Sequence, residues 1–115
     1  MIKSAADMKW DIRENMRDGK GTTKIQHIVN QDELQGKARL VGRISLEPGA
    51  SIGLHPHEQE EEIYYILSGQ GIVVDDGNQE VLNPGDAVVT GGGASHSIAN
   101  TGSEPLEFVA VILTY

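Results

Sequence analysis

Three of the four histidines in this chain, together with one glutamate, have the residue types and spacing of metal ligands. His55 and His57 are separated by a single residue, so both side chains would point to the same face of an extended strand. Glu62 follows shortly after, and His96 lies in a separate segment. Neutral imidazole and carboxylate together suit a divalent first-row metal. The sequence therefore predicts one divalent metal ion per chain, with Mn or Fe favoured and Zn, Ni or Co also compatible, held by His55, His57, Glu62 and His96.

These four residues indicate a metal site as a set rather than one by one. A lone interior histidine is more often a hydrogen-bonded core residue, and Glu62 alone would be ordinary loop charge. Three imidazoles and a carboxylate converging on one interior are costly without a cation. Four protein ligands leave two positions of an octahedral ion open for water or for a small-molecule anionic ligand.

The segments that would position these residues are short and separated by turns. Turn signals such as Glu47-Pro48-Gly49 and Asp76-Gly77 lie between runs rich in Val and Ile. Such a pattern is typical of an all-β sandwich or barrel. The expected strands are residues 22–29, 39–46, 51–57, 62–67, 72–75, 79–82, 87–90, 95–99 and 106–113, preceded by a short helix around residues 5–16.

Composition narrows the class of protein further. A chain of 115 residues is long enough for one domain with a core, and the absence of cysteine excludes disulfides and thiolate metal sites. A net charge of −8 opposes binding to a phosphate backbone. No apolar run reaches membrane-spanning length, and the charged first 20 residues lack the apolar core of a signal peptide. We therefore expect a cytoplasmic protein with no nucleic-acid or membrane partner.

The motif spacing resembles that of the cupin superfamily. The first family motif, G-x5-H-x-H-x3–4-E-x6-G, is filled at every fixed position, and the second, G-x5-P-x-G-x2-H-x3-N, has Gly91 in place of the usual proline, which we expect to loosen that turn. The resemblance implies an all-β, single-domain cupin jelly roll, a double-stranded β-helix barrel, over residues 38–115. Residues 1–37 would form an N-terminal extension with an edge strand that packs on the barrel or on a dimer partner. The matching residues are Gly49, His55, His57, Glu62 and Gly69, then Gly85, Gly93, His96 and Asn100.

The resemblance leaves the reaction open, because cupins include decarboxylases, dioxygenases, isomerases and binding modules. The chain is similar to small single-domain cupins (monocupins) labelled as oxalate decarboxylases. This favours a metal-dependent enzyme of decarboxylase or lyase type acting on a small carboxylate or oxygen-rich ligand. The alternatives are a non-enzymatic, metal-dependent small-molecule binding module and an Fe(II) dioxygenase. Two-domain oxalate decarboxylases carry an arginine three residues before the first ligand histidine, where this chain has Ile52.

Few other residues are candidates for chemistry. Tyr64 shares the face of Glu62 and is the candidate catalytic residue, as a proton donor or a substrate-orienting group. Arg39 and Arg43 share one face of their strand and would replace the missing arginine only if that face points inward; a solvent-facing position is the simpler interpretation. His27 lies outside the motifs, at the barrel mouth or at a surface or interface.

One cluster of glutamates and one group of apolar N-terminal residues have other expected roles. Glu58, Glu60 and Glu61 are interpreted as solvated loop charge, with Glu60 or Glu61 as a mobile carboxylate over the barrel mouth as the alternative. Met8, Trp10 and Ile12 have no obvious place inside a barrel, and small cupins usually form dimers. We therefore expect a homodimer in which the N-terminal segment packs on a neighbour.

Overall fold

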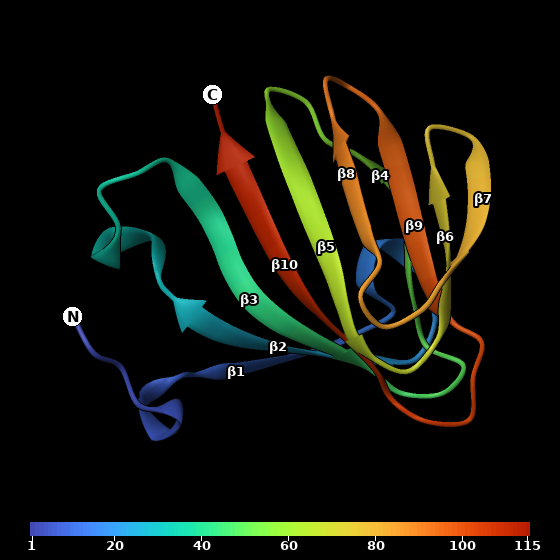
Figure 1. Cartoon of the computed structure of the whole chain (residues 1–115), viewed down its shortest axis with the longest axis horizontal. Helices are drawn as coiled ribbons and strands as arrows, with labels where there is room; N and C mark the ends of the chain where they lie inside the picture. The colour runs from blue at the N-terminus through green and yellow to red at the C-terminus, as the bar shows by residue number, and fades with distance from the viewer.

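Ten short strands form two antiparallel sheets that face each other across one core (Figure 1). The computed structural model describes all of residues 1–115. One sheet has six strands in the order β1-β2-β3-β10-β5-β8, and the other has four in the order β4-β9-β6-β7. The strands are β1 (Trp10–Glu14), β2 (Thr22–Val29), β3 (Ala38–Leu46), β4 (Ser51–Pro56), β5 (Glu60–Ser68), β6 (Gly71–Asp75), β7 (Asn78–Leu82), β8 (Ala87–Gly91), β9 (Ser95–Asn100) and β10 (Leu106–Thr114), and the single-turn 3-10 helices are η1 (Ala5–Asp7), η2 (Met16–Asp18) and η3 (Gln31–Glu33).

Alternation of buried and exposed residues along the strands places the core between the sheets. On β5, Tyr64 and Ile66 are buried, whereas Tyr65 and Leu67 between and after them are exposed. Each large apolar side chain removed from water in this way contributes about 1.5–3 kcal/mol. The expected all-β barrel is confirmed, and each of the nine expected strands is present within two residues of its predicted bounds. The core comprises Ile25, Ile44, Leu46, Ala50, Ile52, Tyr64, Ile66, Val73, Leu82, Ile98, Leu106, Phe108 and Ala110.

The helix expected around residues 5–16 is wrong. Only η1 forms there, and it is followed by the tenth strand, β1, which pairs with β2 from Trp10 opposite Gln26 to Glu14 opposite Thr22. Residues 10–13 alternate apolar and charged side chains, which is the period of a strand. The edge of β2 supplies the hydrogen-bond partners that an isolated helical turn lacks, and this tertiary pairing decides the conformation.

Turn positions explain the remaining residues of the two sequence motifs. Asn100 is buried, and its Nδ2 donates to the carbonyls of Leu46 and Glu104, both at 2.9 Å. Its Oδ1 accepts from the amide of Gly102 at 2.9 Å, so this asparagine joins three chain segments at one end of the barrel. The motif glycines have left-handed backbone conformations that favour glycine, with φ between 83° and 93°: Gly49, Gly69, Gly85 and Gly93.

Two β-bulges change which side chains point inward. Between β4 and β9 the register shifts from Ile52 to His55, so both residues are buried although they are three apart. Between β3 and β10 it shifts opposite Ile112 and Leu113, which leaves Arg39 as the extra residue. Bulges of this kind re-aim side chains next to functional sites. A strict two-residue period therefore fails at both places.

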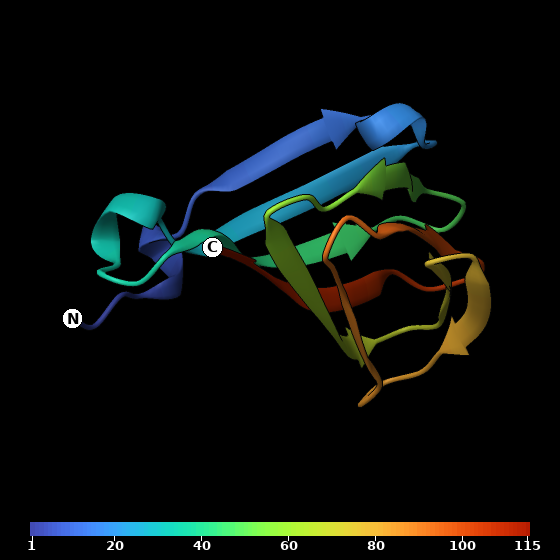
Figure 2. The same ribbon diagram turned by 90° about the horizontal axis from the view of Figure 1, so that it is seen from above.

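The N-terminal segment lies along the side of the barrel (Figure 2). β1 and β2 extend the six-stranded sheet, and η2 at the far end of β1 lies against β4 of the other sheet. The division at residue 38 stays a prediction, because β2 pairs directly with β3 within the same sheet. None of the helices has the length and apolar character that crossing a bilayer requires.

Candidate metal centre

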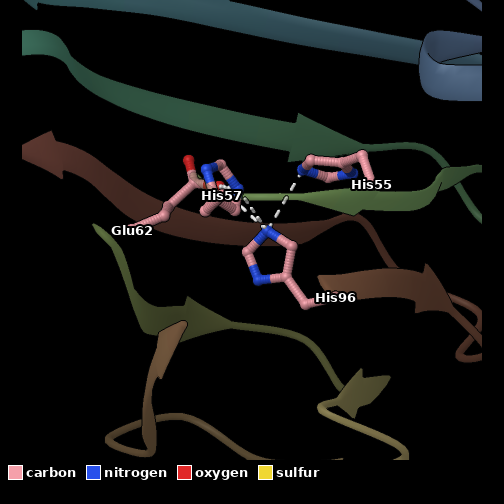
Figure 3. Close-up of side chains that lie close together, drawn as sticks. All are labelled: His55, His57, Glu62 and His96. Atoms are coloured by element: carbon pink, nitrogen blue, oxygen red, sulfur yellow. Dashed lines mark hydrogen bonds and ion pairs between the residues drawn. The ribbon is translucent and has the colours of Figure 1, made fainter. Parts of the chain in front are cut away.

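Strands from both sheets bring the four predicted ligand residues together. His55 on β4 is paired directly with His96 on β9, and His57 follows β4. Glu62 reaches the same point from β5 of the opposite sheet. All four are buried, and one ligand atom from each lies within 4.8 Å of the others. Figure 3 shows the three imidazole rings and the carboxylate pointing toward one another.

The spacing of these atoms fits a single ion. Nε2 of His96 lies 2.9 Å from Nε2 of His57 and 3.1 Å from Nε2 of His55. Oε1 of Glu62 lies 3.0 Å from Nε2 of both His57 and His96. Two atoms bound at right angles to one ion, each about 2.1 Å away, are separated by about 3.0 Å. These four distances therefore match the spacing of neighbouring ligands in one coordination shell.

Two of the histidines have their other ring nitrogen facing a group that only accepts hydrogen bonds. Nδ1 of His55 donates to the carbonyl oxygen of Gly53 at 2.6 Å. Nδ1 of His57 donates to Oε1 of Glu60 at 2.9 Å. Each partner therefore requires the proton on Nδ1, and the neutral form of each ring presents a lone pair on Nε2.

A hydroxyl relay orients the third histidine in the same way. Nδ1 of His96 lies 2.9 Å from Oγ1 of Thr90. That hydroxyl donates its own proton to Asp75, so it accepts from His96. Three Nε2 lone pairs and the Glu62 carboxylate consequently face one another without a hydrogen-bond donor among them. Such an arrangement is unfavourable in a buried site unless a cation occupies it.

The pKa values of Glu62 and the histidines also indicate that this cluster favours a positive charge. Burial alone would raise the pKa of Glu62, but hydrogen bonds that His57 and His96 donate when they are protonated outweigh burial and lower it to about 2. The hydrogen bond with Glu62 raises the pKa of His57 above its ordinary value, whereas burial lowers that of His55. The carboxylate is therefore ionised, and it favours either a proton or a metal ion beside it.

Tyr64 lies next to this cluster, on the predicted face of β5. Its ring stacks on that of His96, with centroids 4.8 Å apart and an interplanar angle of 17°. Its hydroxyl is 3.3 Å from Nε2 of His96. Burial and the nearby Glu62 carboxylate raise the pKa of Tyr64 well above its ordinary value. The phenol therefore stays protonated and able to donate a hydrogen bond at neutral pH. Its catalytic role stays a prediction.

A cavity of about 60 Å³ opens beside three of the four predicted ligand residues, His55, His57 and Glu62. Apart from those ligands, its charged lining consists of three arginines. Arg13 and Arg17 come from the end of β1 and from η2, and Arg39 comes from the bulge in β3. The complete lining is Arg13, Met16, Arg17, Arg39, Ile44, Ile52, His55, His57, Glu62, Tyr64 and Ile112.

The shared orientation expected for Arg39 and Arg43 is wrong. Arg39 lies at the cavity and pairs with Glu60 through two hydrogen bonds, from Nε at 2.6 Å and from Nη2 at 2.8 Å. Arg43 is on the outer face of the same strand, where it pairs with Glu107. The bulge at Arg39 separates the two, because it interrupts the alternation that would keep them together.

The structure corrects the interpretation of Glu60 as loop charge and places His27 away from the cavity. Glu60 begins β5, is partly buried and contacts both Arg39 and His57; the hydrogen bond from Arg39 is the main reason that its pKa falls to about 2. Glu58 remains exposed. His27 lies 3.7 Å from Asp11 on β1 and does not line the cavity.

Sequence reasoning missed several residues at the site and gave Glu60 another role, and some of these residues had a detectable signal. Glu60 shares the two-residue period of Glu62 and Tyr64, so the inner face of β5 could have been extended back to it. Asp75 likewise shares the face of buried Val73. No local pattern indicates that Arg13 and Arg17 reach the site, because their position depends on how η2 packs against β4.

Comparisons with known proteins agree with this geometry. Residues 42–112 match the family model described as the cupin domain. The oxalate-binding protein of Thermotoga maritima is 44% identical over 113 residues, which cover 98% of this chain and 93% of the relative. A crystal structure from Thermotoga maritima, described as "a predicted oxalate decarboxylase", superposes with a TM-score of 0.94 at 43% identity and covers 100% of both chains.

More distant matches extend to proteins with other activities. A sugar phosphate isomerase from Silicibacter pomeroyi has a TM-score of 0.76 at 20% identity, covering 97% of this chain and 74% of that one. This likeness shows the shared fold alone. The family match over residues 42–112, the buried three-histidine, one-glutamate cluster and the jelly-roll topology lead to one conclusion: this chain belongs to the cupin superfamily.

Proposed function

We propose that the protein binds a small dicarboxylate of the oxalate type at a divalent metal ion, with Mn or Fe favoured, held by His55, His57, Glu62 and His96. One observation carries the proposal: three members of the buried four-residue cluster, His55, His57 and Glu62, line a cavity whose other charged side chains are all arginines. The oxalate-binding relative, at 44% identity over nearly the whole chain, supports the same ligand class.

The size of the cavity limits the ligand. Its volume of about 60 Å³ is a few times the roughly 10–15 Å³ that one water molecule needs on the same measure. A ligand of a few heavy atoms therefore fits, whereas a sugar phosphate does not. Ile44, Ile52 and Ile112 form apolar walls, which exclude water and strengthen electrostatic contacts inside.

Each group at the site has a distinct expected role. A bound divalent ion would supply Lewis acidity and two open positions for carboxylate oxygens. Gly53, Glu60 and Thr90 hold the imidazoles with Nε2 directed at the ligand cluster. Tyr64 keeps its proton and can donate a hydrogen bond to a bound carboxylate.

Binding without turnover is the function that this lining favours. Glu62 is the only carboxylate in the cavity, and it belongs to the predicted ligand set. Glu60, the nearest other carboxylate, is held by Arg39 and His57. Proton transfer needs a group whose pKa lies near the working pH, and no uncommitted group of that kind lines the cavity.

A second candidate, decarboxylation of the same ligand, rests on Tyr64. Its protonated hydroxyl lies beside the ligand cluster, 3.3 Å from Nε2 of His96, and it is the one neutral proton donor in the lining apart from the predicted ligand histidines. In this case the tyrosine would deliver a proton to the product. A Tyr64→Phe variant would then lose turnover by a far larger factor than it loses affinity for the ligand.

Calorimetry followed by a product assay tests the proposal. Titration of oxalate into Mn-loaded protein should release or absorb binding heat, and the metal-free protein and a His96→Ala variant should give none. Failure of the Mn-loaded protein to bind oxalate would refute the proposed function. Formate or CO2 release would select the decarboxylase, and O2 consumption with Fe(II) would select a dioxygenase.

We also propose that two copies associate through the outer face of the six-stranded sheet. Cross-strand pairing aligns an apolar row on that face: Val41, Val111, Ile63 and Val89 are consecutive neighbours on β3, β10, β5 and β8. Trp10, Ile12 and Tyr65 on the same face are about half exposed or more. A sheet face open to water normally carries polar side chains, so an apolar one favours a partner.

A single charge in the centre of this row tests the homodimer. Val111→Glu should convert a dimer into a monomer in light scattering at micromolar concentration, while metal content stays unchanged. Val111→Thr, which keeps the β-branched shape, is the matched control and should remain dimeric. A wild type that is monomeric under these conditions would contradict the proposal.

The cytoplasmic location stays a prediction from the polar first 20 residues.

A further inference from the structure

The three arginines around the cavity differ in whether their charge is already paired. Arg39 is held by two hydrogen bonds to Glu60, and Arg13 pairs with Asp11 at 3.0 Å. Arg17 forms no ion pair and no side-chain hydrogen bond, although it also lines the cavity. Its guanidinium is therefore the one cation of the lining that is free to bind a ligand.

We propose that Arg17 binds the carboxylate at the far end of the ligand and thereby determines a preference for dicarboxylates over monocarboxylates. This inference rests on the proposed function, because it assigns the second carboxylate of the same ligand. A planar guanidinium offers paired donors that match a carboxylate, and Arg17 has no competing acid to hold them.

Charge balance at the cavity supports a ligand with two negative charges. A divalent ion, the Glu62 carboxylate and the Arg17 guanidinium carry two net positive charges, since Arg39 with Glu60 and Arg13 with Asp11 are neutral pairs. A dicarboxylate cancels that charge, whereas a monocarboxylate leaves one positive charge uncompensated. The positive charge of Arg17 also acts on buried Tyr64, because it opposes the rise that burial causes in the pKa of that tyrosine.

The backbone around Arg17 is held in a conformation that side chains rarely adopt. Asn15, Arg17 and Asp18 all have positive φ, of 51°, 54° and 62°. Such residues persist only where the surroundings hold them, and they concentrate at ligand-binding positions. Here the amide of Asn15 donates to the carbonyl of Gly21 at 2.9 Å, which closes the turn.

Strand β4 fixes this turn beside the metal centre. The amide of Ser51 donates to the carbonyl of Lys20 at 2.8 Å, and the Ser51 hydroxyl accepts from the amide of Lys20 at 3.0 Å. The carbonyl of Arg17 approaches Gly53 so closely that an added Cβ there would lie 2.0 Å from it. Gly53 is also the residue whose carbonyl orients His55. Arg17 is consequently positioned by the same strand that carries a predicted metal ligand.

The test compares two arginine variants that make the same change in net charge. Arg17→Gln removes the unpaired guanidinium at the cavity, and Arg43→Gln removes a guanidinium on the outer face of the sheet. Mn-loaded proteins are titrated calorimetrically with oxalate and, separately, with acetate. Metal content and melting temperature are measured for each variant, because both should stay at the wild-type level.

Loss of a charge-assisted contact should weaken oxalate binding by Arg17→Gln by about 10- to 100-fold. Acetate affinity should change little, so the preference for the dicarboxylate shrinks, and Arg43→Gln should match the wild type for both ligands. Oxalate affinity that is equal in Arg17→Gln and wild type would overturn the role of Arg17 and leave the proposed function standing. A wild type without oxalate affinity would overturn both.

Discussion

Gly53→Ala should destabilise the protein far more than its single added methyl group suggests. The new Cβ would lie 2.0 Å from the carbonyl oxygen of Arg17, and Cβ atoms essentially never come closer than 3.0 Å to another heavy atom. The turn that carries Arg17 must therefore retreat from β4 by about 1 Å. Both atoms in the contact are fixed to backbone, so no side-chain rotation relieves it.

The cost follows from what the retreat disrupts. Overpacking of this kind costs about 1–3 kcal/mol. The two hydrogen bonds between Lys20 and Ser51 add about 0.5–1.5 kcal/mol each when they are lost. We expect a total of about 2–6 kcal/mol, which lowers the melting temperature of a domain of this size by at least about 6 °C.

Thermal unfolding of metal-free protein measures this effect without contributions from ligand binding. Gly36→Ala is the matched control, because an added Cβ at Gly36 meets no atom within 4 Å. The control should match the wild type or gain up to about 1 kcal/mol from a less flexible unfolded chain. Equal melting temperatures for Gly53→Ala and Gly36→Ala would refute the argument that the Arg17 turn is docked rigidly on β4.

Two further predictions concern the metal centre. Thr90→Val removes the acceptor for Nδ1 of His96 and should weaken Mn binding about 10- to 100-fold in a chelator competition. Thr90→Ser keeps the hydroxyl and should keep wild-type affinity. Equal affinity for all three proteins would contradict the role of the hydroxyl. Metal affinity should also fall as the pH drops from about 8 to 6. Glu62 raises the pKa of His57, so protons compete with the metal ion for its Nε2 at pH values above the ordinary histidine pKa of about 6.5. An affinity independent of pH in this window would count against His57 as a ligand.

The sequence was sufficient to predict the barrel and the ligand cluster, for different physical reasons. Alternation of apolar residues between turns predicts strands because one face of each sheet is buried, as on β5. The cluster was predictable because His55, His57 and His96 share the spacing of a known motif, and the strand pairing of His55 with His96 brings them together.

Other features depend on contacts that local sequence does not encode. Arg39 and Arg43 separate because a bulge interrupts the two-residue period, and the position of a bulge depends on the partner strand. β1 is a strand because β2 offers it an edge. Arg17 reaches the cavity only through the packing of η2 on β4, between segments more than thirty residues apart.

The close contact between Gly53 and Arg17 has a consequence for how ligand preference can change in this group of proteins. The residues matched by the family model begin at 42, so Arg17 and its turn lie outside the part that defines the family. The coordination cluster and the cation that faces it can therefore vary independently, with a glycine at position 53 as the requirement for joining them. An exchange of residues 1–37 between related chains would then transfer ligand preference while the metal centre stays the same.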